Sequence, residues 1–165
     1  MTTTNKPFQL GSISTGTLRT EDLLPAFIEA IGRLGGTLPS DLECVNHMEY
    51  TALPSYDHVG VIDDSIDFWQ SDEAAWDWEA LTTVLEYLCP PFVYFGTLEG
   101  DGADFGFWVN AEALGEAIRS ETDTDESILN DSGILNLPES NVTILYNNDA
   151  VTLLDSNNTI LWDCV

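Results

Sequence analysis

The feature that most constrains this chain is its one-sided charge. No lysine or arginine occurs between Arg33 and Arg119, a gap of 85 residues. The chain of 165 residues holds 29 Asp and Glu against four Lys and Arg, for a formal net charge of −25. Because like charges repel one another, such an excess works against any compact state. Disorder, solvent or function must therefore account for it.

The composition argues against disorder. Acidic disordered segments are poor in aromatic and branched apolar residues, whereas this chain is 44% hydrophobic and contains five Trp, five Tyr and seven Phe. Its length suits one domain of ordinary size. We therefore expect a single acidic domain over residues 1–165, with a polar lead-in over 1–20 and an acidic loop over 121–140.

Three segments have the apolar period of a helix. The first covers residues 23–34, with Asp22 as the expected N-cap and Gly35-Gly36 as the stop. The clearest covers residues 72–88, after the capping residue Ser71. A short third helix follows Asn110. Within the clearest helix, the predicted core face consists of Ala74, Trp78, Leu81, Leu85 and Leu88.

Other segments have the period of strands. The predicted strands are Phe8–Ile13, Leu42–Tyr50, Tyr56–Ile62, Phe92–Leu98, Asp104–Val109 and a C-terminal three-stranded meander over Val142–Tyr146, Val151–Leu154 and Thr159–Trp162. The expected fold class is α+β, with an antiparallel β-sheet of about five to seven strands and about three α-helices.

The charge also excludes classes of partner. Nucleic acid and anionic membranes are bound through Lys and Arg, and four scattered basic residues cannot form such a surface. We predict no direct nucleic-acid binding and no membrane association. Residues 1–10 lack a signal-peptide apolar run, and three distant cysteines indicate no disulfide framework. A cytoplasmic location is expected.

Catalytic and metal signals are weak. Cys44 and His47 lie three residues apart, but no third orienting motif accompanies them. The two His and three Cys lack zinc-site spacing. The segment Glu99–Asp104 is glycine-rich and acidic, but it lacks the calcium-loop pattern and favours a hairpin loop. We predict no enzyme activity, no catalytic residue, no metal and no cofactor.

The polar face of the helix over 72–88 is the main candidate site. Asp72, Glu79 and Glu86 recur every seven residues and so share one face of the helix. No basic residue relieves the repulsion between them, as would be usual on a merely solvated face. Trp76 lies on the same polar side, either as an interface anchor or packed under the loop over 63–70. The predicted partner-binding residues are Asp63, Asp64, Asp67, Trp69, Asp72, Glu73, Trp76, Asp77, Glu79 and Glu86.

In composition and size the chain resembles the DNA-mimic inhibitors that phages and plasmids use against restriction or CRISPR enzymes. This resemblance rests on a net charge of −25 in 18.2 kDa, and on no matched motif. It implies a non-enzymatic inhibitor whose carboxylates replace DNA or RNA phosphates on a basic nucleic-acid-binding protein. Such a protein is of the anti-restriction or anti-CRISPR type.

Two alternatives stay open. An acidic adaptor or immunity-type protein would neutralise a basic partner without mimicking nucleic acid. A haloadapted domain would use its carboxylates to hold water and cations at high salt, with its function elsewhere. A homodimer is open as well, because an edge of the C-terminal meander offers a surface for pairing.

Overall fold

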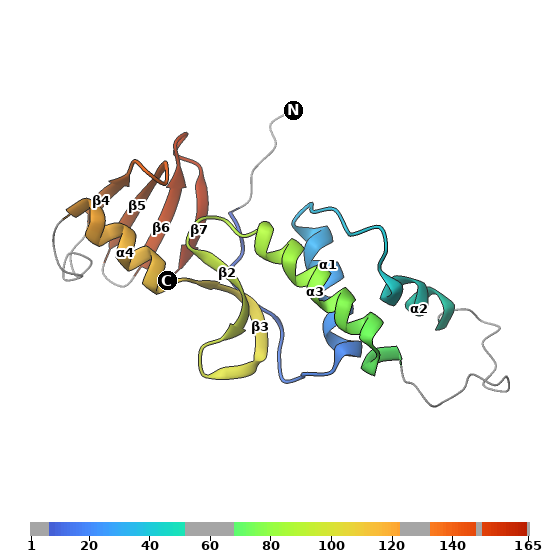
Figure 1. Ribbon diagram of the computed structural model, residues 1–165. Coiled ribbons are helices and arrows are strands. Elements are labelled where there is room, and N and C mark those ends of the chain that lie inside the picture. The colour runs from blue at the N-terminus through green and yellow to red at the C-terminus, as the bar shows by residue number, and fades with distance from the viewer. Residues whose placement is uncertain (1–6, 52–67, 123–132, 148–149, 165) are drawn as a thin grey trace, which may run out of the picture. The chain divides into compact units, whose positions relative to one another are not determined.

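A computed structural model describes residues 7–51, 68–122, 133–147 and 150–164 (Figure 1). The chain divides into two compact units. Unit 1 comprises residues 1–12, 89–96 and 106–165, and unit 2 comprises residues 13–88 and 97–105. The α+β class is confirmed. The described strands form two antiparallel sheets rather than one, and four α-helices occur where about three were expected.

Unit 2 is built around two long helices that lie side by side (Figure 1). Helix α1 covers Thr20–Arg33 and helix α3 covers Asp72–Tyr87. A short helix α2, Glu43–Thr51, and a single 3-10 turn η1, Phe68–Gln70, both pack against α3. The buried core of this unit includes Leu23, Leu24, Phe27, Ala30 and Ile31 from α1, Ala74, Leu81 and Leu85 from α3, and Phe105.

The N-terminal cap and the inner face of α3 are as the sequence predicts. The Ser71 side chain accepts a hydrogen bond from the backbone N–H of Ala74 (3.3 Å), which confirms the predicted cap. Trp78 lies on the inner face, with its ring centroid 5.0 Å from that of Phe27 and 5.3 Å from that of Phe105. The predicted core face of α3 is therefore confirmed, and the opposite face is left to solvent.

Two predictions for this unit were wrong. Helix α1 begins at Thr20, and Asp22 does not cap it; its carboxylate instead accepts a hydrogen bond from the Thr17 hydroxyl. The segment Leu42–Tyr50 is mostly the helix α2 and not a strand. The end of α1 agrees with prediction, since Gly35 has a φ of +74°, a conformation that glycine adopts without strain. The predicted strand Tyr56–Ile62 lies outside the described residues.

Unit 1 contains a four-stranded sheet covered by one helix (Figure 1). The strands are β4 Gly133–Leu137, β5 Val142–Asn147, β6 Ala150–Asp155 and β7 Ile160–Cys164, paired in that order. Helix α4, Ala111–Thr122, packs Leu114 and Ile118 onto the sheet. The Asn110 side chain caps this helix by accepting a hydrogen bond from the Ala113 N–H (2.9 Å). The Asn110 cap and the C-terminal meander are both confirmed.

The fourth strand of this sheet was missed. β4 lies inside the stretch 121–140 that we predicted to be an acidic loop. Its inward positions are Gly133, Leu135 and Leu137, and the Tyr146 side chain on β5 lies across Gly133. An aromatic ring that covers a glycine supplies packing that the glycine itself lacks. The sequence of β4 alone does not predict this contact, because the contact depends on the position of Tyr146 in β5.

The remaining strands form a sheet with the order β1-β3-β2. They are β1 Gly11–Ser14, β2 Val93–Leu98 and β3 Asp101–Val109. Strands β2 and β3 form the predicted hairpin, and its acidic, glycine-rich connection is a tight turn at Glu99-Gly100.

Candidate functional surface

The exposed face of α3 carries carboxylates and aromatic rings in one stripe. At about 100° per residue, seven side chains, that of Asp72 included, lie within about 60° of the direction of Asp72, and six of them are larger than the methyl group of Ala75. These six residues, which we call the α3 stripe, are Asp72, Trp76, Glu79, Thr83, Glu86 and Tyr87, and all are exposed. The stripe lies opposite the core face, so the packing of α3 in unit 2 fixes which way it points.

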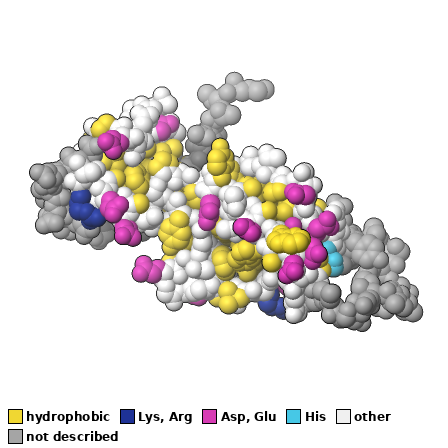
Figure 2. Space-filling model, in the orientation of Figure 1, with side chains coloured by type: hydrophobic (Ala, Val, Ile, Leu, Met, Phe, Trp, Pro, Cys, Tyr) yellow, Lys and Arg dark blue, Asp and Glu magenta, His cyan; other side chains and the backbone are white. Residues whose placement is uncertain are grey.

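The carboxylates of the α3 stripe have no cationic partner. Asp72, Glu79 and Glu86 take part in no ion pair in the part of the chain that the structure describes. The ion pair found there joins Arg19 to Glu21. Figure 2 shows Asp and Glu side chains lying among apolar ones over the helices of unit 2. Each carboxylate of the stripe therefore keeps its full charge toward solvent or a partner.

Two large aromatic side chains accompany these carboxylates. Trp76 is 65% exposed, so the described part of the predicted covering loop, residues 68–70, does not bury it; residues 63–67 of that loop lie outside the described residues. Tyr87 is 87% exposed and lies eleven residues further along, about 16 Å up the helix axis. Exposed Trp and Tyr beside charged groups are typical of contact surfaces for proteins. Tyr87 was not among the predicted binding residues, although the helical wheel places it about 60° from Asp72, on the polar side.

Asp77 is not part of this surface. We predicted it as a partner-binding residue, but its side chain is only 5% exposed. Its Oδ2 accepts a hydrogen bond from the N–H of Cys44 (2.6 Å), and its Oδ1 accepts one from the N–H of Glu43 (3.3 Å). These N–H groups belong to the first turn of α2, whose dipole also attracts a negative charge. Asp77 therefore holds α2 against α3.

The other predicted residues fall into three groups. Glu73 is exposed next to the α3 stripe, as expected for a binding residue. Trp69 is half-buried in η1, and its ring meets those of His47 and Phe68 edge-on, at centroid distances of 5.2 and 5.1 Å. The remaining three, Asp63, Asp64 and Asp67, lie outside the described residues.

The cysteine nearest to a histidine in the sequence is not a nucleophile. Burial, a hydrogen bond to the Asp77 carboxylate and the negative charge of that carboxylate raise the pKa of the Cys44 thiol to about 12. A thiol must lose its proton to react. Cys44 thus stays protonated at neutral pH, and its place next to Asp77 is structural.

This pKa predicts how stability responds to alkaline pH. In the unfolded chain a cysteine thiol has a pKa of about 8.5, so above that pH the unfolded state releases a proton that the folded state keeps. The free energy of unfolding should then fall as pH rises, by up to about 1.4 kcal/mol per pH unit from this group. Urea unfolding between about pH 8 and pH 10 measures the slope. The Cys44→Ala variant should have the shallower slope, and equal slopes would contradict the assignment.

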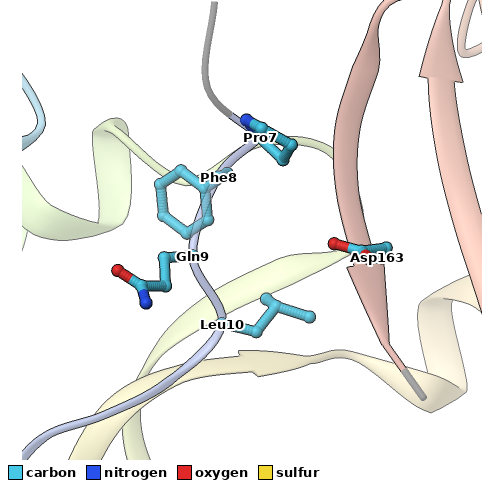
Figure 3. Close-up of a pocket in the computed structure, with 5 residues that line it drawn as sticks. All are labelled: Pro7, Phe8, Gln9, Leu10 and Asp163. Carbon is cyan, nitrogen blue, oxygen red and sulfur yellow. The ribbon is translucent and has the colours of Figure 1, made fainter.

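Each of the two units contains a cavity larger than 300 Å³. In unit 2, a cavity of about 310 Å³ lies at the N-terminal end of α3, between Trp69, Trp78 and the first turn of that helix. In unit 1, a hollow of about 400 Å³ separates residues 7–10 from β7. Figure 3 shows Leu10 and Asp163 facing one another across this hollow. Among the described residues that line this hollow, Asp163 is the ionisable one.

Neither a metal centre nor a membrane-spanning helix is found in the described residues. Over the described ranges, no three His, Cys, Asp or Glu side chains come together in a way that suits a metal ion. No helix within those same ranges has both the length and the apolar character needed to cross a membrane. Comparisons with protein-family models, curated proteins and solved structures returned no significant match.

Proposed function

We propose that this protein is a non-enzymatic inhibitor that binds the nucleic-acid-binding surface of a basic protein through the α3 stripe. The observation that carries this proposal is the stripe itself: three uncompensated carboxylates in one row, flanked by the exposed rings of Trp76 and Tyr87. The carboxylates would take the place of phosphates at Lys and Arg side chains, and the two rings would pack against the partner.

The charge of unit 2 as a whole supports the choice of a basic partner. This unit contains 18 of the 29 acidic residues and two of the four Lys and Arg. A field of one sign speeds the encounter with an oppositely charged protein and suppresses binding to acidic ones. Nucleic acid itself would be repelled, so the partner must supply the positive charge.

The spacing of the carboxylates favours a second candidate as well. Asp72, Glu79 and Glu86 are about 10.5 Å apart along the helix axis, whereas B-DNA presents one charge per about 1.7 Å. The row alone is thus about sixfold sparser than DNA, and the other acids of unit 2 would have to contribute to a mimic. An acidic adaptor that binds a basic protein away from its nucleic-acid site needs no such density. The two candidates differ in whether DNA competes for the partner.

A double charge reversal tests the position of the surface. In Glu79→Lys/Glu86→Lys, attraction becomes repulsion at two points of the α3 stripe, and affinity for the basic partner should fall at least about tenfold. Both side chains are exposed and neither makes a hydrogen bond or ion pair to another described residue, so the fold should persist. Surface plasmon resonance with the basic partner, once a pull-down has identified it, measures the loss of affinity.

The matched control reverses two charges elsewhere. Glu112 and Glu116 are exposed on α4, one turn apart, so Glu112→Lys/Glu116→Lys changes the net charge by the same amount. This control should keep most of its affinity. Equal losses in both variants would mean that overall charge rather than the α3 stripe determines binding. No loss in the Glu79/Glu86 variant would remove α3 from the interface.

The response to salt separates inhibition from haloadaptation. We expect circular dichroism to show a folded protein at about 0.1 M salt, and we expect partner affinity to fall as salt screens the attraction. A haloadapted domain would instead unfold at that ionic strength and refold at molar salt. That second result would overturn the proposed function, because the charge would then be a response to solvent.

A further inference from the structure

The cavity at the N-terminal end of α3 has a lining suited to one flat side chain. Two half-buried tryptophans, Trp69 and Trp78, contribute to it, together with the alanines Ala74 and Ala75 of α3. Polar groups come from Thr20, Gln70 and Ser71. At about 310 Å³ it lies at the lower end of the range for small-molecule pockets. Its size thus favours a single side chain over a larger ligand.

The charge around this cavity favours a cation. Two helices begin there, since Thr20 is the first residue of α1 and Ser71 caps α3. Their dipoles supply about half a positive charge each, which by itself would attract an anion. None of the lining residues is charged, but the same two first turns carry three exposed carboxylates, Asp22, Asp72 and Glu73, whose summed charge is larger and opposite in sign; Glu21 pairs with Arg19.

We propose that this cavity receives an arginine side chain of the basic partner. The inference rests on the proposed function and names what the partner places next to the α3 stripe. A guanidinium group is planar and weakly hydrated, so it stacks on an indole ring more readily than a lysine ammonium group does. The aliphatic stem of the arginine would contact Ala74 and Ala75. The exposed carboxylates in the first turns of α1 and α3 would attract the guanidinium charge without lining the cavity.

Two peptides of equal charge test the proposal. Isothermal titration calorimetry at low salt compares hexa-arginine with hexa-lysine as ligands of the full-length protein. Stacking on the tryptophans should make hexa-arginine bind about two- to fivefold more tightly than hexa-lysine. In NMR spectra, the indole N–H signals of Trp69 and Trp78, assigned with Trp→Phe variants, should shift more with hexa-arginine.

A variant that fills the cavity provides the decisive comparison. Ala75 lines the cavity but is itself exposed on α3, so Ala75→Leu adds bulk there without a charge change and with little loss of helix propensity. This variant should remove the preference for hexa-arginine and leave hexa-lysine binding unchanged. Ala111→Leu, at an exposed position of α4, is the matched control and should keep the preference.

The outcomes separate this inference from the proposed function. If both peptides bind equally, and Ala75→Leu changes neither affinity, the cavity does not take arginine. The proposed function would survive that result, provided that Glu79→Lys/Glu86→Lys still weakens both peptides. If neither peptide binds the wild-type protein at low salt, the proposed function and this inference both fail.

Discussion

Replacing Asp77 with alanine is expected to lower the free energy of unfolding by about 2–4 kcal/mol. The substitution removes the acceptor for the backbone N–H groups of Glu43 and Cys44, and the N–H of Cys44 is buried. A buried donor left without an acceptor costs about 1–3 kcal/mol, and loss of a helix cap costs about 0.5–2 kcal/mol more. Urea unfolding followed by tryptophan fluorescence measures the change.

A second readout of this substitution follows from the Cys44 thiol. Without Asp77, the hydrogen bond and the negative charge that raise the pKa of Cys44 are gone, and the first turn of α2 is released. Cys44 should then react with a thiol reagent at about pH 8 much faster than in the wild-type protein. Glu79→Ala, which truncates an exposed carboxylate of the same helix, is the control and should alter neither readout. If Asp77→Ala and Glu79→Ala behave alike, Asp77 does not anchor α2.

Substituting Gly106 with alanine is expected to destabilise the protein by about 2–3 kcal/mol. A Cβ atom at this position of β3 would lie 2.3 Å from the carbonyl oxygen of Gly11 and 2.8 Å from the Cα of Ser12. Both atoms are backbone of β1, so the strand itself would have to move. A shift in the midpoint of urea unfolding reports the loss.

Another glycine of β3 supplies the control. A Cβ at Gly102 would meet nothing within 4 Å, and the position is exposed. Gly102→Ala should therefore be close to neutral, or slightly stabilising through a smaller entropy loss on folding. If the two alanine variants were equally stable, the close approach of β1 to β3 would not contribute to the fold.

Local pattern was enough to predict the elements whose stabilising contacts are near in sequence. The cap at Ser71, the apolar face of α3 and the strands of the C-terminal meander all depend on residues within a few positions of one another. The α+β class follows from these elements. The same helical wheel predicted that Trp76 lies on the polar side, with its exposure left open, and the predicted range 72–88 already contained Tyr87, which the wheel places about 60° from Asp72.

The elements that were missed depend on distant residues. Helix α2 begins where Asp77, more than thirty positions along the chain, accepts hydrogen bonds from its first turn. Strand β4 includes a glycine that is covered by the ring of Tyr146. At about 100° per residue, Asp77 lies about 140° from Asp72, at the edge of the apolar face, so the helical wheel already distinguished it from the exposed acids. The wheel does not show which donors its carboxylate meets.

Asp77 also shows that the carboxylates of this acidic chain have different roles. One buried carboxylate joins two helices through backbone N–H groups, whereas Asp72, Glu79 and Glu86 remain in water without a cation. A buried charge has to be satisfied by hydrogen bonds, and here backbone donors substitute for Lys or Arg. The few basic residues of this chain are therefore compatible with a well-packed interior.

The most direct test of the proposed function is a pull-down from cell lysate at about 0.1 M salt, repeated with competing duplex DNA. We predict capture of a basic nucleic-acid-binding protein that duplex DNA displaces, and a loss of that capture with the Glu79→Lys/Glu86→Lys variant. A captured protein that duplex DNA does not displace would contradict mimicry and would favour the acidic adaptor. Capture that is unchanged by the Glu79→Lys/Glu86→Lys variant would contradict the central claim that the α3 stripe is the binding surface.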